Sequence, residues 1–297
     1  MTTKTMPTTA EWDALVERMT ALCAAEPFVT TWSLQDLRDG GQAAALQGDL
    51  IVPSASVRKT AILMAALAQV HAGTLELDQP VVISERYIVN TSGPFRNFTP
   101  GFTITLRDAL IMMIVVSDNA ATGEVAERVG LDAVQELCQR LEMHGTTHRH
   151  LVPPKLTFDH PVEYTNATTA NDQTLLLEAI VRGAQEAGAA SILGSTPDLC
   201  QLALDILSWQ ELTNRLPWLL PYGVKVSHKT GRGARNWNDA GVVHDRDGQP
   251  LFALSVFTDQ VPEVLPDGRA GRGAASLLIA RLCREAWDAL GPDRTSY

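Results

Sequence analysis

The stretch Pro53-Ser54-Ala55-Ser56-Val57-Arg58-Lys59 introduces a long run rich in alanine and leucine that ends at Gly73. Because proline and serine favour helix starts and glycine favours helix ends, this pattern predicts a buried helix over residues 56–72. Ser56 and Lys59 are three residues apart, so a helix would place the hydroxyl and the amine on one face. Such a lysine can accept the proton of a serine nucleophile if burial or positive neighbours lower its pKa. The same four residues also fit an N-cap serine followed by a solvent-facing lysine.

Two further motifs follow along the chain. Ser117-Asp118-Asn119 lies between an apolar run at residues 110–116 and a helical run at 120–129. Lys229-Thr230-Gly231 follows a predicted strand at residues 224–228. Taken alone, the first is a common helix-capping cluster and the second an ordinary exit from a strand. With the Ser56 motif they form the ordered set S-x-x-K, S-D-N and K-T-G, which in this context is typical of serine acyl-enzyme chemistry.

Both ends of the chain are predicted to contain a helix together with strands. The N-terminal part predicts a helix and then a strand, and the C-terminal part predicts three strands and a final helix, whereas the middle is mainly helical. We therefore expect an α/β fold of the α+β type, in which an antiparallel sheet flanked by the terminal helices carries an inserted all-helical lobe. The predicted sheet lobe comprises residues 1–52 and 222–297, and the helical lobe comprises residues 53–221. A site is expected in the cleft between them.

Composition excludes several other classes of function. The 297 residues carry a formal net charge of -10, and the sequence pI is about 5.2, so nucleic acid and anionic lipid are poor partners and a small-molecule substrate is expected. No segment resembles a signal peptide or a membrane span, which favours a cytoplasmic protein unless an export signal has been removed. The four cysteines are scattered without metal-ligand spacing, so we interpret them as buried apolar groups. No cofactor is implied.

The three motifs resemble those of the penicillin-recognising serine enzymes, most closely the class A β-lactamase-like serine hydrolase branch. The resemblance spans roughly residues 28–290, and the stretches at 103–108, 166–169 and 238–242 match further landmarks of that family. It implies a single catalytic unit with the β-lactamase/transpeptidase fold.

The resemblance also implies a role for each motif residue. Ser56 would attack a carbonyl, Lys59 would accept its proton, and Ser117 with Lys229 would relay a proton to the leaving atom. Asn119 would orient a substrate amide. Lys229 and Thr230 would hold a substrate carboxylate, and Gly231 of the same motif would also contact the substrate. The backbone N–H groups of Ser56 and Arg232 would form an oxyanion hole. Arg235 is a further candidate for anion binding, or else a solvated side chain.

One family feature is missing from the sequence. Class A enzymes carry a glutamate after the S-D-N motif that activates the water for deacylation, but residues 148–154 contain no carboxylate. Asp159 and Glu163 lie later in the loop and are candidate alternative bases or surface charges. The chain is therefore interpreted as a serine hydrolase that acts on a small amide, ester or lactam. An acyltransferase or cyclase of small-molecule biosynthesis, a class A-like β-lactamase and a non-turnover binding protein remain open alternatives.

Overall fold

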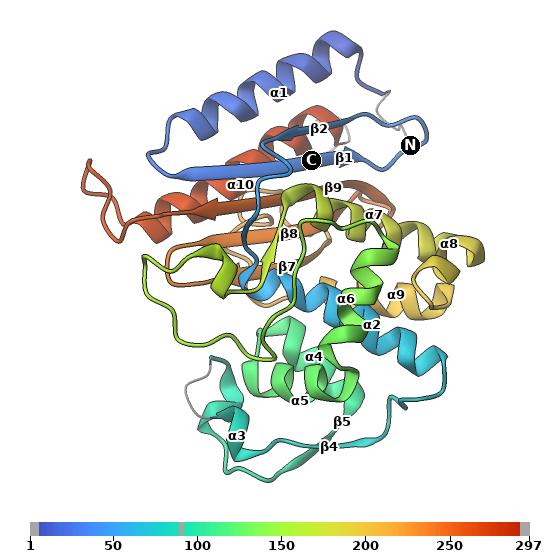
Figure 1. Ribbon diagram of the computed structural model, residues 1–297. Helices are drawn as coiled ribbons and strands as arrows, with labels where there is room; N and C mark the ends of the chain where they lie inside the picture. Colours follow the sequence, from blue (N-terminus) through green and yellow to red (C-terminus); the bar gives the residue numbers. More distant parts are fainter. Residues whose placement is uncertain (1–5, 89–91, 292–297) are drawn as a thin grey trace.

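A five-stranded antiparallel sheet forms the centre of the computed structural model, which describes residues 6–88 and 92–291 (Figure 1). The strand order is β2-β1-β9-β8-β7, so strands from both ends of the chain pair with one another. In the central pair, Val29 of β1 lies opposite Asp259 of β9. The strands are β1 (Val29–Asp36), β2 (Ala43–Leu46), β7 (Val226–Arg232), β8 (Trp237–His244) and β9 (Pro250–Asp259).

The sheet separates two hydrophobic cores because successive side chains of a strand point to opposite faces. In β9, Phe252 and Leu254 belong to the core beneath the terminal helices, whereas Ala253 and Phe257 belong to the core shared with the helical lobe. This alternation explains why nearly all of β9 is buried although it lies in one layer. Both faces of the sheet are therefore covered.

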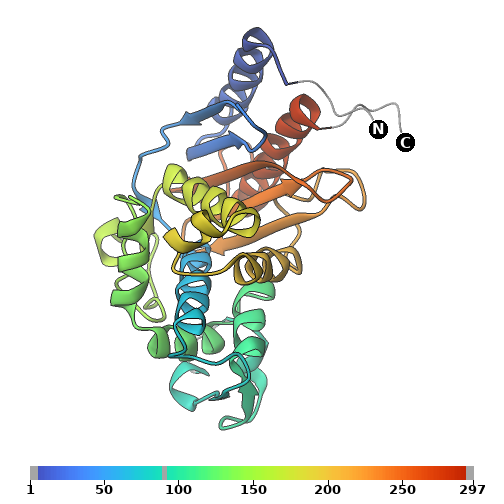
Figure 2. The same cartoon turned by 90° about the vertical axis from the view of Figure 1, so that its right-hand side faces the viewer.

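Helices α1 (Thr9–Ala24) and α10 (Gly271–Leu290) pack together on one face of the sheet (Figures 1 and 2). In α1 the buried residues Trp12, Leu15 and Met19 recur at helical spacing and form its apolar stripe. A capping box, in which the side chains of Thr8 and Glu11 bond to each other's backbone N–H, starts this helix. Helix α7 (Ala170–Gln185) contacts β1, β8 and β9 from the other face.

The remaining helices form the second lobe. Its central helix, α2, is buried along most of its length. The helices of this lobe are α2 (Lys59–His71), α3 (Glu85–Ile88), α4 (Leu106–Val115), α5 (Asn119–Val129), α6 (Leu131–Arg140), α8 (Ala187–Ile192) and α9 (Pro197–Ser208). Two small ribbons, which the sequence did not predict, tie its loops together. They pair β3 (Val52–Pro53) with β6 (Ala167–Thr168) and β4 (Pro80–Val82) with β5 (Thr103–Thr105).

The predicted fold class is confirmed, and two boundaries differ. Residues 56–58 lie in a 3₁₀ turn, η1 (Ala55–Arg58), so α2 begins only at Lys59. The motif Lys229-Thr230-Gly231 lies inside β7 because the strand continues to Arg232. All four cysteines are buried, as expected. Within the described residues, every helix is too short or too polar to cross a lipid bilayer.

Candidate active site

The turn that carries Ser56 is anchored from two sides. Asn236 and Asn238 each donate an amide hydrogen bond of 3.0 Å to the carbonyl of Pro53, and the N–H and hydroxyl of Ser54 both bond to the carbonyl of Asn166 at 2.9 Å. Ala55 adopts a left-handed backbone conformation with φ 46°, which turns the chain sharply into η1. Ser56 is thereby held on a fixed turn at the junction of the two lobes.

Lys59 occupies the first turn of α2 beneath the Ser117 motif. Its Nζ bonds to the carbonyl oxygen of Ser117 at 2.9 Å, to the hydroxyl of Ser117 at 3.1 Å and to Oδ1 of Asn119 at 2.8 Å. Burial, followed by the positive charges of Lys229 and Arg58, holds the pKa of Lys59 well below its ordinary value. A neutral amine in this position can accept a proton.

The Ser117 motif owes its shape to Asp118. This buried carboxylate caps α5 by accepting the N–H of Ala121 at 2.9 Å, and it accepts the N–H of Phe95 at 2.8 Å. The preceding Ser117 has φ 57°, a conformation that is uncommon for residues other than glycine. The strained backbone points both oxygens of Ser117 at Lys59. Asp118 therefore fixes the backbone of the motif, whereas the side chains of Ser117 and Asn119 reach the cleft.

Gly231 allows β7 to approach the turn of Ser56 closely. A Cβ atom at this position would lie 3.0 Å from Cγ2 of Val57 and 3.1 Å from the carbonyl oxygen of Ser54. Both distances are tighter than ordinary van der Waals contacts, so any larger residue would push the strand away from the turn. A glycine at position 231 thus sets the width of the cleft.

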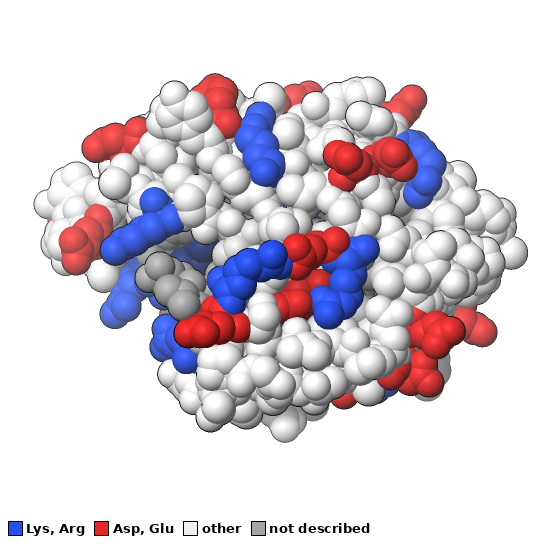
Figure 3. Space-filling view, turned by 60° about the horizontal axis from the view of Figure 1, so that its bottom comes forward, with Lys and Arg blue, Asp and Glu red and all other residues white. Residues whose placement is uncertain are grey.

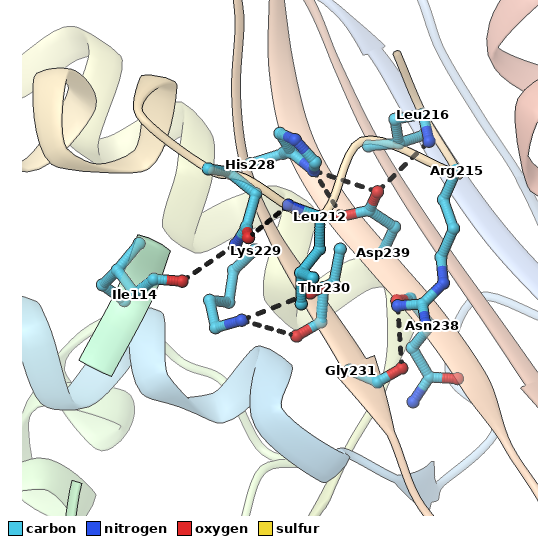
Figure 4. A network of polar contacts seen from close by, with 11 residues as sticks. Ile114, Leu212, Arg215, Leu216, His228, Lys229, Thr230, Gly231, Asn238 and Asp239 are labelled. Carbon is cyan, nitrogen blue, oxygen red and sulfur yellow. Dashed lines mark hydrogen bonds and ion pairs between the residues drawn. The ribbon is translucent and has the colours of Figure 1, made fainter. Parts of the chain in front are cut away.

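Lys229 is fully buried in β7 (Figure 4). Its Nζ donates to the carbonyl oxygen of Thr230 at 2.8 Å, with the Thr230 hydroxyl at 3.4 Å. Burial lowers the pKa of Lys229 to about 7, an effect that Asp239 opposes and Arg215 reinforces. Asp239 is itself committed to His228 at 2.9 Å and to the N–H of Leu216 at 3.1 Å. Lys229 is therefore an amine whose charge changes near neutral pH.

Two pockets meet at Ser56, Ser92, Arg232 and Gly233. The first, which we name the arginine-lined pocket, has a volume of about 670 Å³ and also contains Thr230 and Ser117. It takes its name from four side chains, namely those of Arg96, Arg215, Arg232 and Arg272. None of its described lining residues is acidic. On the face shown in Figure 3, Lys and Arg side chains border a hollow at the left of the view.

Arg215 is one of the pocket residues that the sequence analysis missed. Its guanidinium is buried, and Nη1 donates to the carbonyl oxygens of Gly231 at 3.1 Å and Asn238 at 2.8 Å. Its Nε has no hydrogen-bond partner within the described structure. Arg215 lies in an irregular segment without a motif, so only the three-dimensional fold brings it to β7.

The second pocket, which we name the loop-side pocket, has a volume of about 420 Å³. It extends from Ser56, Lys59 and Asn119 to the loop residues 153–156, His160 and Thr165, and its described lining residues include no aspartate or glutamate. Asp159 and Glu163 are exposed and line neither pocket. The described residues also contain no group of three or more His, Cys, Asp or Glu side chains that could hold a metal ion.

Arg235 is neither solvated nor open to a substrate anion, which corrects both expectations for this residue. Its Nε and Nη2 bond to the two carboxylate oxygens of Asp259 at 2.7 and 3.0 Å, and its Nη1 donates to the carbonyl of Phe158 at 3.0 Å. Both ion-pair partners are buried. A paired, buried guanidinium fixes the loop against the end of β9.

Known proteins share this architecture. A model of the beta-lactamase enzyme family matches residues 14–290. The extended-spectrum beta-lactamase PER-1 of Pseudomonas aeruginosa is 28% identical over 230 residues, which cover 71% of this chain and 68% of that protein. A beta-lactamase from Sphaerobacter thermophilus matches with a TM-score of 0.79 and 24% identity over 94% of this chain and 97% of that chain. A mutant of PBP-A in an acyl-enzyme complex with penicillin-G matches with a TM-score of 0.77 and 22% identity over 93% and 96% of the two chains.

Proposed function

The chain belongs to the beta-lactamase enzyme family, and on this premise we propose that it is a serine hydrolase in which Ser56 forms an acyl-enzyme with a small amide, ester or lactam. The observation that carries the proposal is the environment of Lys59. This amine has a lowered pKa and lies on the turn directly after Ser56, and its three acceptors all belong to the Ser117 motif. An amine in that state can take the hydroxyl proton as Ser56 attacks.

The same contacts supply a route for the proton. Lys59 bonds to the Ser117 hydroxyl, which can pass the proton on to the leaving nitrogen or oxygen with the assistance of Lys229. The backbone N–H groups of Ser56 and Arg232 would stabilise the negative charge on the carbonyl oxygen. Asn119 would orient the amide of the substrate, because it lines the loop-side pocket next to Lys59.

The arginine-lined pocket supports a substrate that carries a carboxylate. Four arginine side chains line this pocket, and none of its described lining residues is acidic; Asp239, the carboxylate that interacts with Arg215 and Lys229, lies outside that lining. Cationic side chains in a partly enclosed site attract anions more strongly than they would in open solvent.

Covalent labelling tests the proposal directly. Treatment with a fluorophosphonate or with penicillin should produce one adduct, which peptide mass spectrometry should place on Ser56. The Ser56→Ala variant should remain folded and unlabelled, whereas Ser54→Ala, which removes the neighbouring hydroxyl bonded to Asn166, should still be labelled. An adduct on another residue, or labelling of Ser56→Ala, would show that the nucleophile lies elsewhere.

Acyl transfer is a second candidate function, favoured by the absence of a carboxylate from the described lining of the loop-side pocket. Without a carboxylate to activate water, an amine or alcohol that occupies the pocket could accept the acyl group instead. Adding candidate amines during ester turnover and looking for the amide product by mass spectrometry separates the two functions.

A further inference from the structure

His160 lines the loop-side pocket together with Ser56 and Lys59. Only 6% of the residue is exposed, and its Nε2 is buried without a hydrogen-bond partner among the residues that the structure describes. A buried polar atom without a partner is costly, and in a folded protein it commonly indicates a bound water or ligand. Nothing in the acylation chemistry above uses this side chain.

The hydrogen bond of Nδ1 of His160 determines which tautomer the ring adopts, and thus whether Nε2 carries a hydrogen. Nδ1 lies 2.7 Å from the carbonyl oxygen of Thr157. A carbonyl oxygen can only accept, so Nδ1 carries the hydrogen. In the neutral imidazole the lone pair is then on Nε2, which is the arrangement that a general base requires.

The loop around His160 is held rigidly. Arg235 donates to the carbonyl of Phe158, and its bidentate pairing with Asp259 ties that contact to the end of β9. The hydrogen bond within residues 157–160 then fixes the imidazole relative to the loop. Arg235 is therefore a positioning residue for His160.

Asn236, which lines the same pocket, also carries an unpaired acceptor. Its Nδ2 bonds to the carbonyl of Pro53, and its Oδ1 is buried beside Gly233 without a partner in the described structure. A neutral imidazole Nε2 and an amide oxygen both accept hydrogen bonds. The group that complements them is an O–H or N–H donor, such as water, an alcohol or an amine.

We propose that His160 is the general base that activates the nucleophile for release of the acyl group from Ser56. This inference rests on the proposed acyl-enzyme. The oxygen of water forms a bond to the acyl carbon while its proton moves to Nε2 of His160. The bond between the acyl carbon and Oγ of Ser56 then breaks, and the proton on Nε2 passes to Oγ, which leaves the carboxylic acid and the free serine. An amine or alcohol acceptor follows the same steps and yields an amide or ester.

Pre-steady-state kinetics with p-nitrophenyl acetate separate the two half-reactions, because the burst reports acylation and the slow phase reports deacylation. In His160→Gln the burst should keep the parent rate, and the slow phase should fall about a hundredfold or more, the usual contribution of general-base catalysis. The matched control is His150→Gln, since His150 lies in the same loop, bonds to the carbonyl of Tyr164 and lines neither pocket. Its slow phase should equal that of the parent.

Chemical rescue distinguishes a base from a structural residue. His160→Ala should regain part of its slow phase when imidazole is added, whereas the parent should not respond. A slow phase in His160→Gln within twofold of the parent, or a slowed His160→Ala that imidazole does not restore, would overturn the role of His160. Absence of both a burst and a Ser56 adduct in the parent would instead overturn the acyl-enzyme and, with it, this inference.

Discussion

Lys59 is the residue whose removal should separate binding from chemistry. It supplies the only amine in the turn that carries Ser56, and its bonds to Ser117 and Asn119 hold it in place. Lys59→Met should lower the rate of Ser56 labelling by about a hundredfold to ten-thousandfold, because the hydroxyl loses its proton acceptor. Labelling is followed by intact mass spectrometry, with Lys225→Met, which alters a partly exposed lysine, as the control. Equal rates in parent and Lys59→Met would refute this assignment.

Lys229 predicts how substrate binding changes with pH. Burial lowers its pKa to about 7, so the ammonium is present below this pH and is lost as the pH rises through it. The KM for mono(p-nitrophenyl) succinate, an anionic ester, should therefore increase as the pH rises above about 7, whereas that for neutral p-nitrophenyl butyrate should change little. Lys229→Met should raise the KM of the anionic ester at pH 6 and flatten its pH dependence. An identical pH dependence for the two esters would argue against this role.

Individual residues differ in how far the sequence could predict them. The S-x-x-K and S-D-N motifs singled out Lys59, Ser117 and Asn119 as candidate site residues, but the hydrogen bonds of Lys59 to the other two join segments about 60 residues apart and were not predicted. The positions of Arg215 and His160 depend on the packing of irregular segments against the sheet, which no local pattern encodes. Arg235 was misjudged because it lies in the turn between β7 and β8, whereas its partner, Asp259, is at the end of β9.

Among the elements, β7 is the one whose position the site depends on most. Gly231→Ala would add a methyl group 3.0 Å from Val57, and relief of this contact requires the strand to move away from η1. We expect a loss of about 1–3 kcal/mol in the free energy of unfolding and slower labelling of Ser56. Urea denaturation and fluorophosphonate labelling measure the two effects.

A matched control is Gly188→Ala in α8, where an added Cβ would meet no atom within 4 Å. This variant should keep parental stability and labelling, since alanine also favours the helix. If Gly231→Ala labelled Ser56 as fast as Gly188→Ala does, the close approach of β7 to the turn would not matter for acylation.

The elements themselves were largely predictable where they are long. The sequence pattern predicted a helix near each end of the chain and three C-terminal strands, which correspond to α1, α10 and β7 to β9. The ribbons β3/β6 and β4/β5 were not found, because strands of two or three residues are too short to show a period. Ser56 was expected at the start of a regular helix, but the left-handed Ala55 tightens the first turn into 3₁₀ geometry.

At the scale of the whole molecule, the cleft between the lobes should release β-lactam products slowly. Its described lining contains no carboxylate and leaves deacylation to the proposed base His160, so we expect acylation through Lys59 to outpace deacylation. Stopped-flow mixing with a chromogenic cephalosporin should show a burst near one equivalent of enzyme and then a slow phase. Rapid multiple turnover without a burst would contradict this expectation. If Glu163→Gln then abolished that turnover, the base would be Glu163, and the protein would be a working β-lactamase.

The pairing of β1 with β9 also constrains the order in which this chain can fold. Val29 meets Asp259, about 230 residues later, so at ribosomal speeds of roughly 5–20 residues per second β1 waits on the order of 10 to 50 s for its partner. During that interval α2 and α4–α9, which lie between them in sequence, can already pack together. Strand β1, with its apolar side chains Trp32 and Leu34, remains without its partner β9 until the last hairpin leaves the ribosome. Nascent chains are therefore most exposed to aggregation and to chaperone capture at β1.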